Sequence, residues 1–272
     1  MSTPTTAPAT TLPAAAPARP GVPGPLRRTL SLARVELLLL RRNRTALFTA
    51  VALPVGVIAL LASVGGDRLS GGRGAATAVN MVTASLLLFV VFYNVLSAAV
   101  ARREEGVLQR LRTGEATDAE VLVSLALPSA LVTVVMTGVL VLAGFAALDL
   151  QLPSSPLLVL AGLLLGVVAH SALALVTATW TRTLESAQVT SLPVIAVCAV
   201  GGGFAVPLDA LPPAVARVAE FTPLAPVVEL LRAGWIGEPT FADVAVWTGT
   251  LLGWVVVGVL LVRSGFRWSP RS

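Results

Sequence analysis

The stretch 150–181 reads LQLPSSPLLVLAGLLLGVVAHSALALVTATWT and contains no Asp, Glu, Lys or Arg. A helix that crosses a lipid bilayer needs about 20 mostly apolar residues, so this stretch is long enough to form one. Backbone groups inside lipid have no water to bond to, which leaves helices and closed barrels as the structures that can span. A barrel strand would alternate apolar and polar side chains, and this stretch does not. It therefore predicts a transmembrane helix.

Five more stretches of the chain repeat this pattern. The six predicted spans lie at about 45–66, 76–101, 121–148, 156–180, 186–208 and 243–262. Of the 272 residues, 56% are hydrophobic and only 12% are charged, whereas roughly a quarter of the residues are charged in an average soluble domain. A soluble globular protein is excluded because its surface would lack polar cover. The sequence predicts an all-α membrane protein with six transmembrane helices.

The arginines predict how these helices are oriented. All 19 basic residues are Arg. With the N-terminus in the cytoplasm, every arginine except Arg68, Arg73, Arg217 and Arg232 lies on the cytoplasmic side. Cytoplasmic loops carry such an excess, so both termini are predicted to be cytoplasmic in a multi-pass protein of the cell membrane. The same bias explains the net charge of +5, so no nucleic-acid partner is expected.

The N-terminal part before the first span divides into two segments. Residues 1–25 are rich in Pro, Ala and Thr, which predicts a disordered cytoplasmic tail. No apolar run follows a basic start, so a signal peptide is not expected. On a helix, segment 26–42 places Leu30 and Leu37 on one stripe beside Arg34. This pattern predicts an interfacial helix with arginines near lipid phosphates, and the alternative is a cytoplasmic extension of the first span.

The segment between the second and third predicted spans, 102–120, reads RREEGVLQRLRTGEATDAE. An apolar ridge of Val107, Leu108 and Leu111 is flanked by charges, which suits a short surface helix at 102–113 that docks another protein. An ordinary solvated loop, whose arginines only set the topology, is the alternative. Thr117 and Glu120 have the spacing of a capping box that opens the next helix. The predicted docking residues are Arg103, Glu104, Glu105, Val107, Leu108, Leu111 and Arg112.

The segment between the last two spans is too polar to cross the membrane and too apolar for a free loop. Pro212 and Pro213 suit the start of a helix, and Pro223 and Pro226 interrupt it. Two half-helices that dip back into the outer leaflet, as a re-entrant hairpin at 209–240, fit this pattern. Backbone of this kind is tolerated at such depth only when it packs against protein. The alternative is an amphipathic cap lying flat on the membrane.

These segments, in this order, resemble the permease (transmembrane) subunits of type 2 ATP-binding-cassette (ABC) exporters. Residues 103–112, REEGVLQRLR, are similar to the family's R-x-E-G-T/V-L-x-x-L-R stretch. The segment from Leu211 to Arg232 resembles its outer LP…PL…R hairpin, and Phe266-Arg267-Trp268 its F-R-W ending. The resemblance covers about residues 26–269, and the chain departs from the family in the 1–25 tail and at Gly114-Glu115-Ala116.

The resemblance implies a function and partners. Residues 26–269 would be one transmembrane domain with an interfacial helix, a coupling helix and a re-entrant hairpin. Two ABC ATPase subunits and a second permease copy or homologue would complete the exporter. Since the chain has no Lys, it cannot form a P-loop, so it is not expected to be an enzyme or to bind a cofactor.

The spans themselves suggest the cargo. The spans lack charged side chains that could pair with a charged cargo, and only 5% of the residues are aromatic. Both observations favour an amphiphilic or apolar molecule such as a drug, an antibiotic or a lipid. A polysaccharide-exporting permease and an ATP-independent carrier or channel are the alternatives. Cys198 and His170 are the only Cys and His, too few for a metal cluster. The residues predicted to face a path or dimer seam, or else to make ordinary bonds between helices, are Asn80, Asn94, His170, Gln188 and Thr190.

Overall fold

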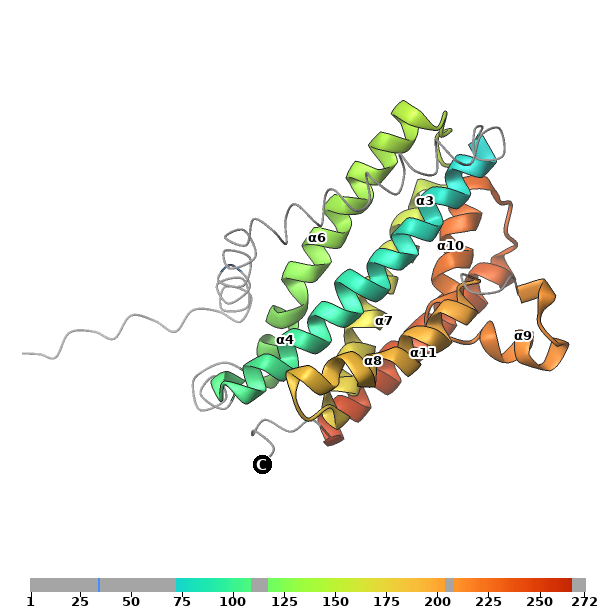
Figure 1. The fold of residues 1–272 in the computed structure, drawn as a ribbon. Coiled ribbons are helices and arrows are strands. Elements are labelled where there is room, and N and C mark those ends of the chain that lie inside the picture. Colours follow the sequence, from blue (N-terminus) through green and yellow to red (C-terminus); the bar gives the residue numbers. More distant parts are fainter. Residues whose placement is uncertain (1–33, 35–71, 109–116, 204–207, 266–272) are drawn as a thin grey trace, which may run out of the picture.

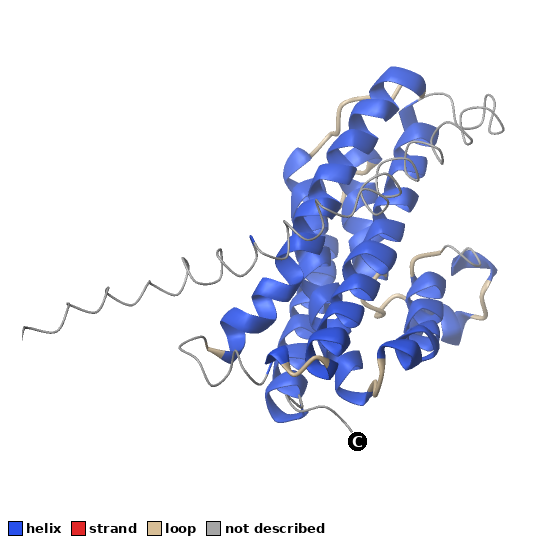
Figure 2. Cartoon of the chain, turned by 60° about the vertical axis from the view of Figure 1, so that its left-hand side comes forward, coloured by secondary structure: helices blue, strands red, loops and turns tan. Residues whose placement is uncertain are grey.

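The computed structural model describes residues 34, 72–108, 117–203 and 208–265, and all regular structure in this part of the chain is helical (Figure 2). Five helices are long and apolar enough to cross a membrane, and they overlap five of the six predicted spans. Their bounds are Gly72–Glu104, Asp118–Ala147, Pro156–Trp180, Leu184–Gly201 and Phe241–Gly265. The predicted tail, the first span at 45–66 and all of the interfacial helix except Arg34 lie outside the described residues.

The helices form one bundle around a central member (Figure 1). In chain order the described helices are α3 (Gly72–Leu86), the π-helical turn η2 (Leu87–Phe92), α4 (Tyr93–Glu104), α6 (Asp118–Ala147), α7 (Pro156–Trp180), α8 (Leu184–Gly201), the short turn η3 (Leu208–Ala210), α9 (Pro213–Ala219), α10 (Ala225–Ile236) and α11 (Phe241–Gly265). The segments α3, η2 and α4 run on as one long helix. Helix α7 packs against α4, η2, α10 and α11 and is the centre of the bundle.

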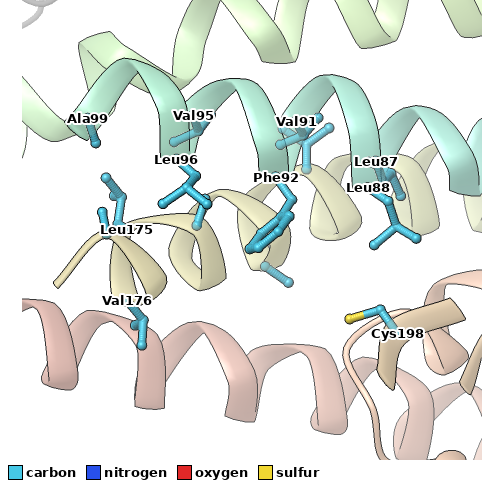
Figure 3. Packing of buried hydrophobic residues seen from close by; sticks show 14 of the residues in the cluster. Leu87, Leu88, Val91, Phe92, Val95, Leu96, Ala99, Leu175, Val176 and Cys198 are labelled. Carbon is cyan, nitrogen blue, oxygen red and sulfur yellow. The ribbon is translucent and has the colours of Figure 1, made fainter. Parts of the chain in front are cut away.

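Small residues on α7 explain this central position. A Cβ atom added to Gly166 would lie 2.8 Å from Leu87 Cδ1, and one added to Gly162 would lie 3.1 Å from Leu230 Cβ. Without side chains at these two positions, η2 and α10 approach the α7 backbone closely, which is how apolar helices gain contact in a membrane. Farther along the long helix after Leu87, Phe92 on η2 and Leu96 on α4 are fully buried and point toward α7 (Figure 3).

Different loops lie at the two ends of the bundle. At the Gly72 end, Gly72 lies against Gln151, and the amide of Ser155 donates to the Gly234 carbonyl over 2.9 Å. At the opposite end, called here the Arg103 end, Arg103 reaches the end of α7. Asp118 and Arg263 line one shared groove there. The chain therefore turns alternately at the two ends, as successive spans must.

The predicted capping box at the start of α6 is confirmed. The Thr117 hydroxyl accepts from the Glu120 amide over 3.3 Å, and the Glu120 carboxylate accepts from the Thr117 amide over 2.6 Å. These two bonds satisfy donors that the first turn of a helix leaves unpaired. The start of α6 is thus fixed by four neighbouring residues and could be found from sequence.

Candidate functional site

The predicted docking segment begins as the last turn of α4 instead of as a separate helix. Arg102 and Glu104 still belong to α4, and the chain then turns at Glu105 and Gly106. Gly106 has a φ of 68°, in the left-handed region where glycine carries no steric cost. Residues 102–104 are thus helical as part of α4, and the turn at Glu105 and Gly106 separates them from the rest of the predicted docking helix. Helical geometry resumes at Val107, and residues 109–116 lie outside the described part of the chain.

Arg103 is buried inside the protein, which corrects its expected place on a docking surface. Its exposed fraction is 0%, and its guanidinium lies at the C-terminal end of α7. Nη1 donates to the Ala178 carbonyl over 2.8 Å, while Nη2 donates to the carbonyls of Thr181 and Arg182. The last carbonyls of a helix have no partner within the helix and carry partial negative charge. Arg103 satisfies such carbonyls from another helix.

Glu104, the next residue, bonds to the start of α8. Its carboxylate accepts from the Leu184 amide over 3.2 Å, and this amide is one that the first turn of α8 cannot pair. Glu105 is exposed and accepts from Arg102 Nη1 over 3.1 Å. The end of α4 thus contacts both helices that meet at the loop 181–183.

The predicted apolar ridge is only partly exposed at the protein surface. Leu108 has an exposed fraction of 0% and belongs to the main hydrophobic core. Val107 is half-buried, and Leu111 and Arg112 lie outside the described residues. Leu108 therefore packs within the chain. Among the predicted docking residues that the structure describes, Glu105 and Val107 are left for contact with another protein, because the Glu104 carboxylate bonds to Leu184.

The five residues predicted for a path or seam do not share one exposed face. Asn80 and His170 are buried by the chain's own helices, and His170 Nδ1 donates to the Gly166 carbonyl over 2.8 Å. Thr190 is half-buried, and its hydroxyl donates to the Ser186 carbonyl over 2.8 Å. Of these five residues, Asn94 on α4 and Gln188 on α8 are the ones with exposed amide groups.

The segment between α8 and α11 forms the two short helices expected of a hairpin, α9 and α10. The turn between them contacts the middle of α11, where Trp254 Nε1 donates to the Phe221 carbonyl over 2.8 Å. Val227, near the start of α10, lies against Gly166 of α7. Trp254 is thirteen residues into α11, about 20 Å along its axis at 1.5 Å per residue. The turn therefore reaches far into the bundle from the Gly72 end.

The glycines at the end of α8 make room for this turn. A Cβ atom on Gly201 would overlap the Thr222 side chain, and one on Gly202 would lie 2.7 Å from Leu224 Cδ2. A run of small residues such as Gly201-Gly202-Gly203 permits close packing, but the sequence does not say which segment packs there. Gly234 serves the same purpose on α10, where its Cβ would lie 2.6 Å from Val159 Cγ2. Helix α10 accordingly continues past Gly234 to Ile236.

An apolar groove of about 570 Å³ opens at the Arg103 end between α6, α7 and α11. Ala126, Val168 and Val259 are among its lining residues, and Ser171 and Arg263 add polar groups. Sequence reasoning missed this groove because each of three separate spans contributes one wall. In the part of the chain that the structure describes, no three His, Cys, Asp or Glu side chains gather as metal ligands would.

Comparison with known proteins identifies the family. A search among curated proteins found no match. A family model described as ABC-2 type transporter matches residues 27–235, which include the end of α4, the loop between α7 and α8, and the hairpin up to Trp235. The match covers well over half of the chain. The chain therefore belongs to the ABC-2 type transporter family, as a membrane-spanning permease component of an ABC transporter.

Proposed function

We propose that the chain is the transmembrane subunit of an exporter that moves an amphiphilic or apolar molecule out of the cell. The permease component of this family is not itself catalytic, and the ATPase lies in a partner subunit. The observation that carries the proposal is the charged end of α4, which lies between two spans and contacts α7 and α8. Glu105 and Val107 form the docking surface for the ATPase, together with Leu111 and Arg112 from the sequence prediction.

The proposed topology places the Arg103 end in the cytoplasm. It has six spans, including the first at 45–66, an interfacial helix at 26–42 and both termini inside. The hairpin at 209–240 then enters from the outer side, which is supported by the contact of its turn with Trp254 in the middle of α11. The half-helices would be covered by protein at that depth, as irregular backbone in a membrane requires.

Cysteine labelling tests this orientation. In a Cys198→Ala background, Glu238→Cys at the Gly72 end should react with an impermeant thiol reagent on intact cells, because both the residue and that end face outward. Ser264→Cys, just after Arg263, should react only after the cells are opened. Both side chains are exposed, so access to the reagent depends on the side of the membrane. Labelling of Ser264→Cys in intact cells would reject the orientation.

The apolar groove supports an amphiphilic cargo. Its lining is mostly hydrophobic, and the polar groups of Ser171 and Arg263 suit a molecule with one polar end.

A second permease copy is supported by α8, whose side chains Val189 and Leu192 are 70% and 62% exposed and need cover from lipid or protein. Asn94 and Gln188 are proposed to face that seam.

Association with the ATPase tests the docking surface. Val107→Asp should weaken copurification of the ATPase by about tenfold, because loss of one buried Val side chain costs at least 1.4 kcal/mol, on the order of one decade in affinity. Glu105→Ala should have a smaller effect, since exposed ion pairs contribute about 0–1 kcal/mol. The measurement is pull-down of the ATPase encoded nearest to this permease.

A matched control makes the same change on α9, away from the end of α4. Val215→Asp on α9 replaces a valine that is 47% exposed, and it should leave copurification at the wild-type level. Membrane insertion of each variant is measured first. If Val107→Asp inserts and still copurifies fully, the segment is only a topology-setting loop, and the docking surface is elsewhere.

A further inference from the structure

We infer that Arg103 is a positioning residue that makes the end of α4 and the loop between α7 and α8 move as one unit. This inference rests on the proposed function, since it concerns how movement imposed by the ATPase reaches the spans. It adds that α7 and α8 are the spans driven directly, through the loop 181–183.

The burial of Arg103 is the first observation. Taking a guanidinium out of water is unfavourable unless its donors are paired, and here Nη1 and Nη2 donate to the carbonyls of Ala178, Thr181 and Arg182. One of these carbonyls belongs to α7 and the other two follow its end. The planar guanidinium can bond in this way to several acceptors at once in fixed directions, which a lysine ammonium does less well. Separating α4 from α7 would break these hydrogen bonds of a buried charge.

Glu104 supplies a second, independent contact. It bonds to the Leu184 amide at the start of α8, so adjacent residues of α4 hold the two sides of the same loop. The loop itself is short, because α7 ends at Trp180 and Thr183 already caps α8. The Thr183 hydroxyl accepts from the Ser186 amide over 3.1 Å, and the Thr183 amide donates to the Ser186 hydroxyl over 2.9 Å. Movement of α4 is therefore passed to both helices.

The neighbouring spans differ in how firmly they are held. Helix α7 is the centre of the bundle, whereas α8 is covered by the chain over only 22% of its apolar window. A helix with so few internal contacts is free to follow a force applied at its first turn. Glu104 applies that force at Leu184, and the far end of α8 lies against the hairpin turn at Thr222. The contacts of Arg103 and Glu104 with the loop 181–183 and the start of α8 are called here the clamp. The clamp thus connects the docking surface to the hairpin through α8.

Amide hydrogen exchange tests the clamp on the full chain in lipid nanodiscs. Glu104→Ala should speed exchange of the Leu184 amide by about tenfold, because it loses a charged hydrogen-bond acceptor. Glu185→Ala is the matched control: Glu185 is exposed one residue into α8 and makes no bond among the described residues, so exchange at Leu184 should not change. Arg103→Lys should speed exchange of the amides that follow Ala178. Unchanged exchange in both Glu104→Ala and Arg103→Lys would overturn the inference.

The transmission step is tested by adding the ATPase with and without ATP. In the wild type, nucleotide should change exchange both at 104–108 and at 181–186. In Glu104→Ala and Arg103→Lys, the change at 104–108 should remain and the change at 181–186 should be lost. If the loop still responds in both variants, Arg103 and Glu104 do not transmit the movement. If residues 104–108 of the wild type do not respond, the proposed docking surface fails, while the exchange of the permease alone still decides whether the clamp exists. Should Arg103→Lys not insert, Glu104→Ala, an exposed position, gives the answer.

Discussion

Gly201→Ala should lower the stability of the folded permease by at least about 3 kcal/mol, more than ordinary overpacking of a core. The added Cβ would overlap the Thr222 side chain and lie 2.8 Å from the carbonyl oxygen of Ala219. That carbonyl is backbone and already accepts from the Thr222 hydroxyl, so neither neighbour can move alone. The hairpin turn would be displaced from its position beside α8. We expect a loss of folded protein, measured as thermal stability of the detergent-extracted permease.

The chain contains a matched control for this substitution. Gly253 lies within α11, and a Cβ added there meets no atom within 4 Å. Gly253→Ala should leave the melting temperature close to that of the wild type, because surface changes are usually within about 0.5 kcal/mol. Equal melting temperatures for Gly201→Ala and the wild type would show that the hairpin turn is not held against α8.

Efflux should fall to the level of cells without the permease when the ATPase partner is omitted or cannot hydrolyse ATP. The chain has no Lys and so no P-loop to hold phosphates, and its family places ATP hydrolysis in another subunit. The purified chain alone should hydrolyse no ATP above a detergent blank. Both results are complete losses, which makes this the largest functional effect expected of the system.

The assay pairs cells expressing both subunits with cells expressing the permease alone, using the uncharged dye Nile red as the amphiphile. A P-loop Lys→Ala variant of the ATPase is the control, because it keeps the complex while removing hydrolysis. Efflux that persists without the ATPase would favour the ATP-independent carrier. Robust ATP hydrolysis by the isolated permease would overturn the assignment of its role.

The approximate positions of the described spans and of the α6 cap could be read from the sequence, although α8 ends at Gly201, before the predicted residue 208. The predicted span 156–180 and helix α7 agree, since a run of apolar residues must bury its backbone groups wherever it lies in the membrane. Thr117 and Glu120 pair within one turn of chain. The prolines at 212 and 213 start α9 because their φ angle already suits a helix. Each of these features depends on residues that are close together in sequence.

Only the tertiary structure decided what the charged segment after α4 does. In the sequence, Arg103 and Leu108 look like surface residues of a docking helix, yet both are buried. The partners of Arg103 lie 75 and more positions along the chain, at the end of α7. The same holds for Gly201, whose neighbour Thr222 belongs to the hairpin. Hydropathy and capping act locally and so determine where helices run. Which face of a helix is covered depends on helices brought together by long-range packing, and no local pattern records that choice.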